Sequence, residues 1–181
     1  MGLIYVSSFG DVESRLLLAS ARNIKEVFRL QVRISSVALP PKLGYDPVRK
    51  QHNVNVLLEY LSGVSFPDMV RVVALAGFDL CGDGLDFVFG KASPRGVSVI
   101  VNTYRLRHPN EKVTFERVVK EINYLLGLSF GLKDCEDAKC AMNSSYSLKD
   151  IDKKGRLFCK TCSEKLSSIL SGYTGQENIG T

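Results

Sequence analysis

The sequence is poor in the residues that build many metal sites and membrane spans. It has no tryptophan and only two histidines, His52 and His108, which lie too far apart to form a local three-histidine zinc site. No apolar run approaches the roughly 18 residues that a membrane-spanning helix needs. The segment Met1–Val6 carries neither a basic region nor a cleavage signal for export. We therefore expect an intracellular, cytoplasmic protein with no membrane partner.

The composition is that of an ordinary folded domain. Of the 181 residues, 45% are hydrophobic and 24% are charged, which allows one sizeable core and excludes collagen-like or disordered chains. The formal charge is +5, but lysine and arginine are spread along the chain instead of forming a cluster. This distribution argues against nucleic acid as the main partner.

Hydrophobic periodicity predicts alternating strands and helices. Strands are expected over 3–7, 28–37, 69–76, 85–89 and 97–104, and helices over 12–27, 54–62 and 115–128, the last capped by Thr114. Beyond residue 131 large apolar side chains become fewer, and lysine, serine, aspartate and cysteine are common. The pattern favours an α/β unit over 1–131, with a mixed twisted sheet and flanking helices. A small C-terminal subdomain over 132–181 then needs a metal to hold it together.

Four of the five cysteines have the spacing of a zinc site. Cys135 and Cys140 form one pair, and Cys159 and Cys162 form the second. Two short-spaced pairs in a weakly apolar, intracellular segment predict four thiolates around one Zn²⁺. Such a closed site has no free coordination position, so it is structural. Reduced thiols or two disulfides are the alternatives, and Cys81 is expected to be a small buried apolar residue.

Several segments resemble the archaemetzincins, a family of zinc metallopeptidases. The resemblance lies in residues 45–51 (YDPVRKQ), 79–81 (DLC), 85–92 (LDFVFGKA) and 104–106 (YRL). The four cysteines and Met142, at the position of the family's Met-turn, resemble its C-terminal signature. The resemblance covers roughly residues 3–165. It implies a compact metzincin-like catalytic-domain fold with a structural zinc.

The family's catalytic motif, HExxHxxGxxHC, is degenerate in this chain. Its last Cys falls on Cys135 and its Gly on Gly131, which fixes the register over 124–135. Other residues then stand at the positions of the three His ligands and the general-base Glu: Tyr124, Leu128 and Asp134 for the ligands, and Leu125 for the base. A leucine can neither bind zinc nor take a proton from water. A register starting at Lys120 keeps a Glu but loses the ligands and the junction with Cys135, and we reject it.

The resemblance therefore predicts a pseudopeptidase with one structural zinc and no catalytic ion. A peptide or protein segment is expected in a vestigial cleft, with helix 115–128 as its floor and an edge strand within Val97–Tyr104 as its rim. Pairing with a strand needs no metal. In a simpler interpretation, Tyr124 and Leu128 only fill the vacated space as core. The alternatives are an active metallopeptidase with unusual ligands and a zinc-containing module associated with nucleic acid.

Overall fold

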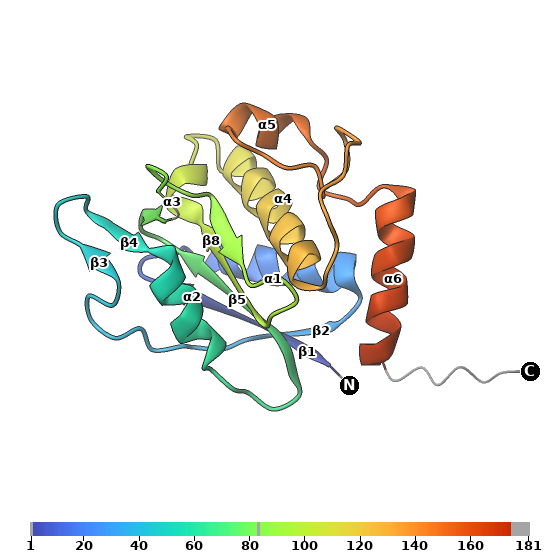
Figure 1. The fold of residues 1–181 in the computed structure, drawn as a ribbon, viewed down its shortest axis with the longest axis horizontal. Helices are drawn as coiled ribbons and strands as arrows, with labels where there is room; N and C mark the ends of the chain where they lie inside the picture. Colours follow the sequence, from blue (N-terminus) through green and yellow to red (C-terminus); the bar gives the residue numbers. More distant parts are fainter. Residues whose placement is uncertain (1, 83, 175–181) are drawn as a thin grey trace, which may run out of the picture.

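A five-stranded sheet forms the centre of the molecule in the computed structural model, which describes residues 2–82 and 84–174 (Figure 1). The strand order is β2-β1-β5-β8-β7. These strands are β1 (Leu3–Phe9), β2 (Gln31–Ile34), β5 (Met69–Ala76), β7 (Gly90–Ala92) and β8 (Ser98–Asn102). Four of them are parallel, and β7 pairs with β8 in the antiparallel direction and forms one edge. The fold is the mixed α/β sheet that the sequence predicts.

A smaller sheet lies beyond one end of the central strands (Figure 1). It consists of β3 (Tyr45–Asp46), β4 (Gln51–Asn53) and β6 (Leu80–Cys81), in the order β3-β4-β6. Cys81 is buried in β6, as the sequence predicts for a small apolar side chain.

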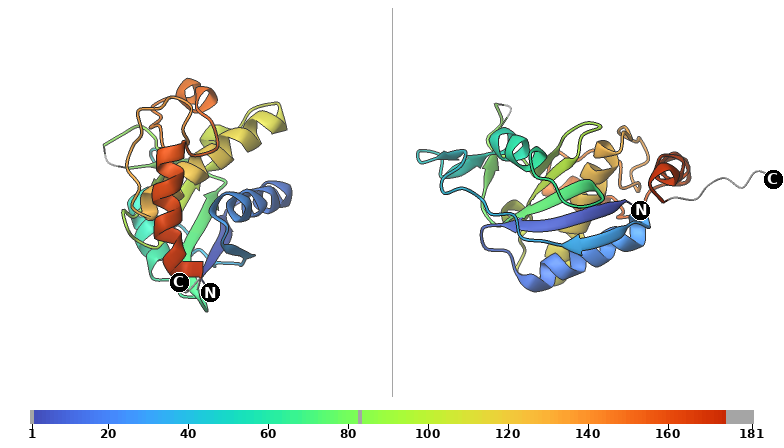
Figure 2. Two further views of the ribbon diagram at one scale, coloured as in Figure 1. Left: turned by 90° about the vertical axis from the view of Figure 1, so that its right-hand side faces the viewer. Right: turned by 90° about the horizontal axis from the view of Figure 1, so that it is seen from below.

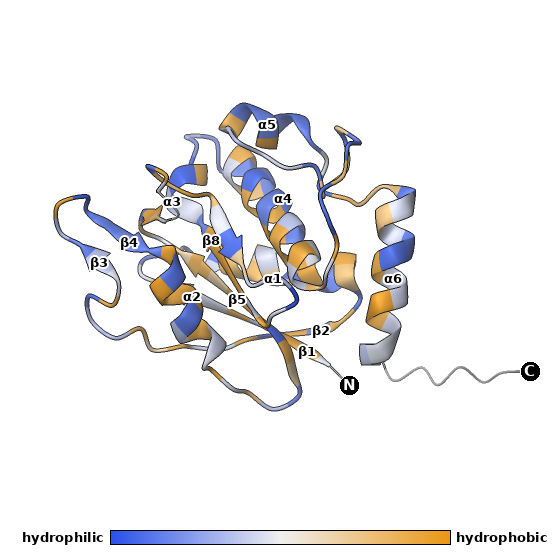
Figure 3. Ribbon diagram, in the orientation of Figure 1, coloured by the Kyte–Doolittle hydropathy of each residue, from blue (hydrophilic) through white to orange (hydrophobic). Residues whose placement is uncertain are grey.

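Helices cover both faces of the large sheet. The helices α1 (Ser14–Phe28) and α4 (Glu111–Ser129) pack against each other on one face, and α2 (Val54–Ser62) packs on the other (Figure 2). Alternate side chains of a strand point to opposite faces. In β1, Ile4 and Val6 accordingly join the core that includes α1 and α4, whereas Tyr5 joins the core under α2. The strands between these layers are largely hydrophobic (Figure 3).

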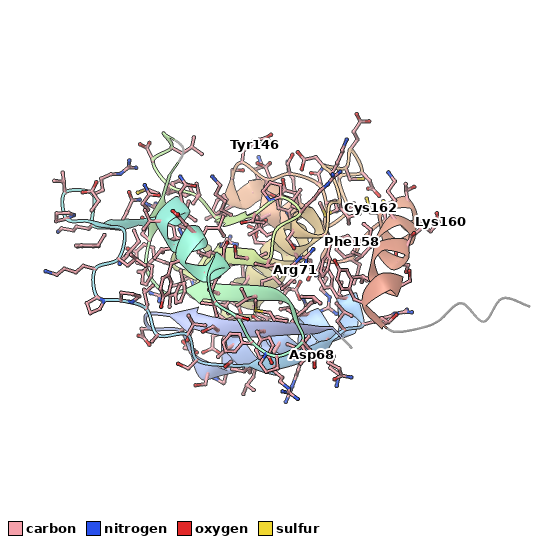
Figure 4. All side chains as sticks on the ribbon, turned by 60° about the horizontal axis from the view of Figure 1, so that its bottom comes forward. Asp68, Arg71, Tyr146, Phe158, Lys160 and Cys162 are labelled. Carbon is pink, nitrogen blue, oxygen red and sulfur yellow. The ribbon has the colours of Figure 1, made fainter. Side chains whose placement is uncertain are left out.

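The C-terminal segment packs onto the end of α4. It contains α5 (Leu148–Lys153) and α6 (Lys160–Thr174), and a short α3 (Thr103–Leu106) precedes α4. Leu166 and Leu170 of α6 are buried in the same core as α1 and α4. Cys162 and Phe158 lie where α6 meets this core (Figure 4). Whether 132–181 is a separate subdomain stays a prediction. No helix of the described residues is long and apolar enough to cross a membrane.

Arg71 of β5 fixes the point where α4 ends. Its Nη2 and Nε donate hydrogen bonds to the backbone oxygen and to Oγ of Ser129, at 2.9 and 3.1 Å. The guanidinium also lies 4.1 Å from the centroid of the Phe130 ring. A cation at the last carbonyls of a helix is favourable because those groups carry partial negative charge. Arg71 thereby positions the loop that leaves α4.

The long helix begins earlier than predicted. It starts at Glu111 and not at 115, because Asn110 caps it by accepting a hydrogen bond from the Lys112 backbone N–H. Thr114 instead bonds to the backbone of His108. The strand expected over 28–37 shortens to β2, since Phe28 is the last residue of α1 and is fully buried.

The prediction that the rim strand lies within Val97–Tyr104 is wrong. β8 lies between β5 and β7, so neither of its edges is free, and β7 is the edge strand on this side of the sheet. The segment 85–89, expected to be a strand, has only an isolated bridge at Leu85. The apolar residues of segment 85–89 predict a strand, whereas Gly90-Lys91-Ala92 has no strand-like pattern. Pairing with β8, and not local propensity, makes β7 extended.

Candidate functional site

The four cysteines of the predicted zinc site come together in space. Cys135 and Cys140 lie in the loop after α4, Cys159 immediately precedes α6, and Cys162 lies in its first turn. Their sulfur atoms all lie within 4.8 Å of one another, and the Sγ atoms of Cys135 and Cys159 are 3.8 Å apart. Ligands about 2.3 Å from a tetrahedral Zn²⁺ are separated by about 3.8 Å. The four thiols therefore fit one tetrahedral zinc ion.

Backbone hydrogen bonds orient two of the sulfur atoms in this cluster and favour the thiolate form of Cys159. The Sγ of Cys140 accepts bonds from the backbone N–H groups of Met142 and Cys159, at 3.4 and 3.2 Å. The pKa of Cys159 lies below its usual value, chiefly because the backbone N–H of Cys162 bonds to its sulfur. Such bonds orient metal ligands and favour their charged state. Burial acts in the opposite direction and raises the pKa of Cys140 and of Cys162. All five cysteines are free thiols in the structure, so the disulfide alternative is not supported.

Two of the three residues that the predicted register places at ligand positions form a hydrogen bond with each other. The Tyr124 hydroxyl, on α4, donates to Oδ1 of Asp134, in the loop that follows, at 2.8 Å. Burial and the neighbouring carboxylate raise the pKa of Tyr124, so its hydroxyl keeps its proton over the whole physiological range. A neutral phenol that donates to a carboxylate is a stable pair without a metal.

The two leucines of the motif belong to the protein interior. Leu125 is buried, and Leu128 is half-buried against the same core. A Cβ atom on Gly90 of β7 would lie 2.6 Å from a methyl carbon of Leu125. β7 therefore lies directly against α4 at Leu125, and only a glycine permits this close approach.

A buried ion pair lies beside Tyr124, and nothing in the sequence pattern predicts it. Lys154 Nζ is 2.9 Å from Oε1 of Glu121, one turn before Tyr124 on α4, and both side chains are at most 5% exposed. The ammonium also donates to the backbone oxygen of Asn143 and lies 4.5 Å from the centroid of the Tyr124 ring. Charged side chains are usually placed at the surface. No local signal could therefore reveal that these two lie buried together.

Glycine and methionine pack closely under the same part of α4. A Cβ atom on Gly127 would lie 2.4 Å from the sulfur of Met142, which is fully buried. The backbone N–H of Cys135 donates to the oxygen of Met142 at 2.9 Å. Met142 therefore connects the four-cysteine cluster to the underside of α4. Its role as a Met-turn stays a prediction from the resemblance.

The two histidines lie elsewhere. His52 stacks on Phe78, with ring centroids 3.9 Å apart, and packs beside Tyr45. His108 precedes α4, and its Nδ1 accepts a hydrogen bond from the Asn110 backbone. Within the described residues, neither belongs to a group of three or more potential metal ligands.

Known proteins are similar to this chain in sequence. The model of Peptidase family M54 matches residues 31–168. Archaemetzincin from Methanopyrus kandleri is 40% identical over 130 residues, which are 72% of this chain and 74% of that protein. Archaemetzincin from Archaeoglobus fulgidus is 29% identical over 163 residues, which are 90% and 98% of the two chains.

Solved structures agree with the sequence comparison. The crystal structure of the Methanopyrus kandleri archaemetzincin superimposes with a TM-score of 0.85 at 33% identity, and the match covers 94% of this chain and 96% of that one. The Archaeoglobus fulgidus structure, complexed with malonate, gives a TM-score of 0.78 at 29% identity, over 90% and 99% of the chains. The fold and the cysteine cluster thus define an archaemetzincin-like zinc peptidase scaffold. This chain belongs to Peptidase family M54, the archaemetzincins.

Proposed function

We propose that this chain is a pseudopeptidase that retains the four-cysteine zinc, lacks a catalytic zinc and binds a peptide segment along β7. The observation that carries the proposal is the hydrogen bond between Tyr124 and Asp134. In the register set by Cys135, these residues stand at the first and third ligand positions of the family motif. Their side chains satisfy each other where a metal would otherwise be bound.

The residues at these positions do not fit a catalytic zinc ion. Leu128 offers only hydrocarbon at the second ligand position, and Leu125 offers no base. Among the described residues, the four cysteines are the only group of three or more His, Cys, Asp or Glu side chains close enough to share an ion. This supports one metal per chain and gives no support to an active enzyme with unusual ligands.

The edge strand provides a surface for an extended peptide. Residues 91 and 100 face each other in the β7–β8 ladder, and the Ser93 N–H donates to the Ser98 oxygen. Hydrogen bonding alternates along an antiparallel strand. The backbone groups of Gly90 and Ala92 therefore face away from β8, in position to pair with a further strand. Because β7 lies against α4 at Leu125, such a peptide would lie next to the former ligand positions.

Metal analysis of the purified protein tests the first part. We expect one zinc per chain, and none in a Cys159→Ser variant. A second equivalent of zinc that survives in this variant would contradict the loss of the catalytic ion. Zinc bound at the cysteines alone, together with no hydrolysis of fluorogenic peptide libraries, is the expected result.

Peptide binding tests the second part. A library of capped hexapeptides is screened for binding, and the best peptide is titrated into the Ala92→Pro and Ala92→Ser variants. Proline removes the outward N–H donor, whereas serine retains it. We expect at least a fivefold loss of affinity in the proline variant only, since one hydrogen bond contributes about 1 kcal/mol. Equal affinity in both variants, with both melting near the wild type, would rule out pairing along β7.

A further inference from the structure

A cavity of about 600 Å³ opens at the carboxyl ends of the central strands, away from the cysteines and from Tyr124. Its walls come from the segment after β1, over residues 11–19, and from the segment between β8 and the first turn of α4, over 103–115. The last of these residues, Phe115, precedes Tyr124 by nine positions, or about 13 Å of helix. The cavity is therefore a separate place in the molecule.

The topology explains why a crevice forms here. From β1 the chain passes through α1 to β2 on one side of the sheet, and it later returns to build β5 and β8 on the other side of β1. The connection after β1 thus leads toward one edge of the sheet, and the connection after β5 leads toward the other. In open sheets with parallel strands, ligands bind in the crevice that such a reversal leaves at the carboxyl ends of the strands. α1 and α4 lie on the same face of the sheet (Figure 2), and both contribute residues to the lining of the cavity.

The floor of the cavity is apolar. We call segment 11–19 the α1 wall and segment 103–115 the α4 wall. Four apolar residues of these walls are only half-buried and expose hydrocarbon to the cavity: Val12, Leu16 and Ala19 of the α1 wall, and Phe115 of the α4 wall. A volume of 300–1,000 Å³ with an apolar floor and a few polar groups is typical of small-molecule sites. The ligand should therefore have apolar side chains.

The net charges of the two walls have opposite signs. Asp11 and Glu13 lie on the α1 wall, and Arg107 and Lys112 lie on the α4 wall beside His108. Arg15 donates to Glu111 across the cavity at 3.1 Å and also lies 3.5 Å from Oε2 of Glu13, so it partly offsets the charge of both carboxylates. A ligand with a positive group at one end and a negative group at the other would match this arrangement.

We propose that this cavity binds a short peptide with free ends and apolar side chains, oriented with its ammonium toward Asp11 and Glu13 and its carboxylate toward Arg107 and Lys112. The assignment does not depend on the state of the former peptidase site. A dipeptide is small enough for the cavity, and its two charges lie at opposite ends of an apolar body.

Four forms of one dipeptide test the proposal. Leucyl-phenylalanine is titrated at low salt, followed by amide shifts in NMR spectra, in its free, N-acetylated, C-amidated and doubly blocked forms. Each exposed ion pair contributes up to about 1 kcal/mol, so blocking either end should weaken binding about two- to fivefold. The shifted amides should belong to residues 11–19 and 103–115.

Variants show which wall of the cavity binds which end of the dipeptide. In Lys112→Gln combined with Arg107→Gln, amidation of the carboxyl end should no longer matter. In Asp11→Asn combined with Glu13→Gln, acetylation of the amino end should no longer matter. Ala19→Phe, which fills the floor, should abolish binding while its melting temperature stays near that of the wild type. Lys25→Gln, in the last turn of α1, is the matched control and should bind normally.

The proposal is overturned if the amide shifts fall outside the cavity or if all four forms of the dipeptide bind equally well. It is also overturned if a form with one blocked end binds more tightly than the free dipeptide. It is also overturned if Ala19→Phe binds as well as the wild type. Absence of binding by the free dipeptide at millimolar concentration overturns it as well.

Discussion

Replacing Lys154 with methionine should destabilise the protein strongly at neutral pH, because it leaves the Glu121 carboxylate buried without a counter-charge. The Lys154 side chain is fully buried and that of Glu121 is 5% exposed. Removing one partner of such a pair typically costs about 3–5 kcal/mol. For a chain of this length, each kcal/mol lowers the melting temperature by about 2–4 °C, so a decrease of about 10 °C is expected.

The pH dependence of this loss identifies its cause. Burial raises the pKa of Glu121 in the folded protein, while Lys154 lowers it, so the variant should raise this pKa further. The folded state then holds a proton that the unfolded state releases as the pH rises, and stability falls with increasing pH. The cost of the substitution should consequently be smaller at pH 5 than at pH 8.

Urea unfolding of the zinc-bound protein at both pH values provides the measurement. Lys153→Met is the matched control, since its side chain is exposed on the neighbouring position, and it should change stability by less than about 0.5 kcal/mol. Glu121→Gln combined with Lys154→Met should recover much of the loss, because no charge then remains buried. A Lys154→Met cost below about 1 kcal/mol at pH 8, or one that does not depend on pH, would refute this reasoning.

Three further predictions concern the zinc cluster, the former motif and Asp79. Chelation of zinc or Cys162→Ser should remove most of the stability, on the order of 10 kcal/mol, and a circular-dichroism melt that is unchanged would contradict it. The family motif can be restored by four substitutions: Tyr124→His, Leu125→Glu, Leu128→His and Asp134→His. This variant should bind two zinc ions per chain instead of one. A zinc content of one would show that the four positions do not converge. Although burial alone would raise the pKa of Asp79, hydrogen bonds from Arg105, Gln51 and Asn102 hold it below its usual value. Stability should therefore fall as acid protonates this carboxylate, and Asp79→Asn should reduce that acid sensitivity in pH-dependent urea melts.

The sequence predicts the features that depend on local spacing. The four cysteines could be found because short gaps between them are rare outside metal sites, and their sulfur atoms do converge. The α/β architecture could be found because strands and helices differ in the period of their apolar residues. Tyr124 and Asp134 could be placed only through the family motif, since neither residue type marks a site by itself.

The features that escaped prediction depend on contacts between distant segments. β7 is a strand because β8 lies beside it, not because Gly90-Lys91-Ala92 favours one. The Glu121–Lys154 pair joins residues 33 positions apart, and each residue alone looks like a surface charge. The cavity near Phe115 results from the reversal of strand order, which periodicity does not reveal.

In the proposed pseudopeptidase, contacts around α4 would hold the scaffold together without a catalytic ion. A metal at the motif would tie α4 to the loop that follows it, and here the Tyr124–Asp134 hydrogen bond makes that connection. A hydrogen bond to a charged group contributes about 1.5–3 kcal/mol, so it replaces only part of a metal's contribution. The remaining stabilisation comes from other contacts of α4 and of the loop that follows it. Met142 packs against Gly127, Arg71 bonds to the carbonyl end of α4, and the four cysteines converge in the loop that follows. None of these contacts requires a ligand at Tyr124, Leu128 or Asp134.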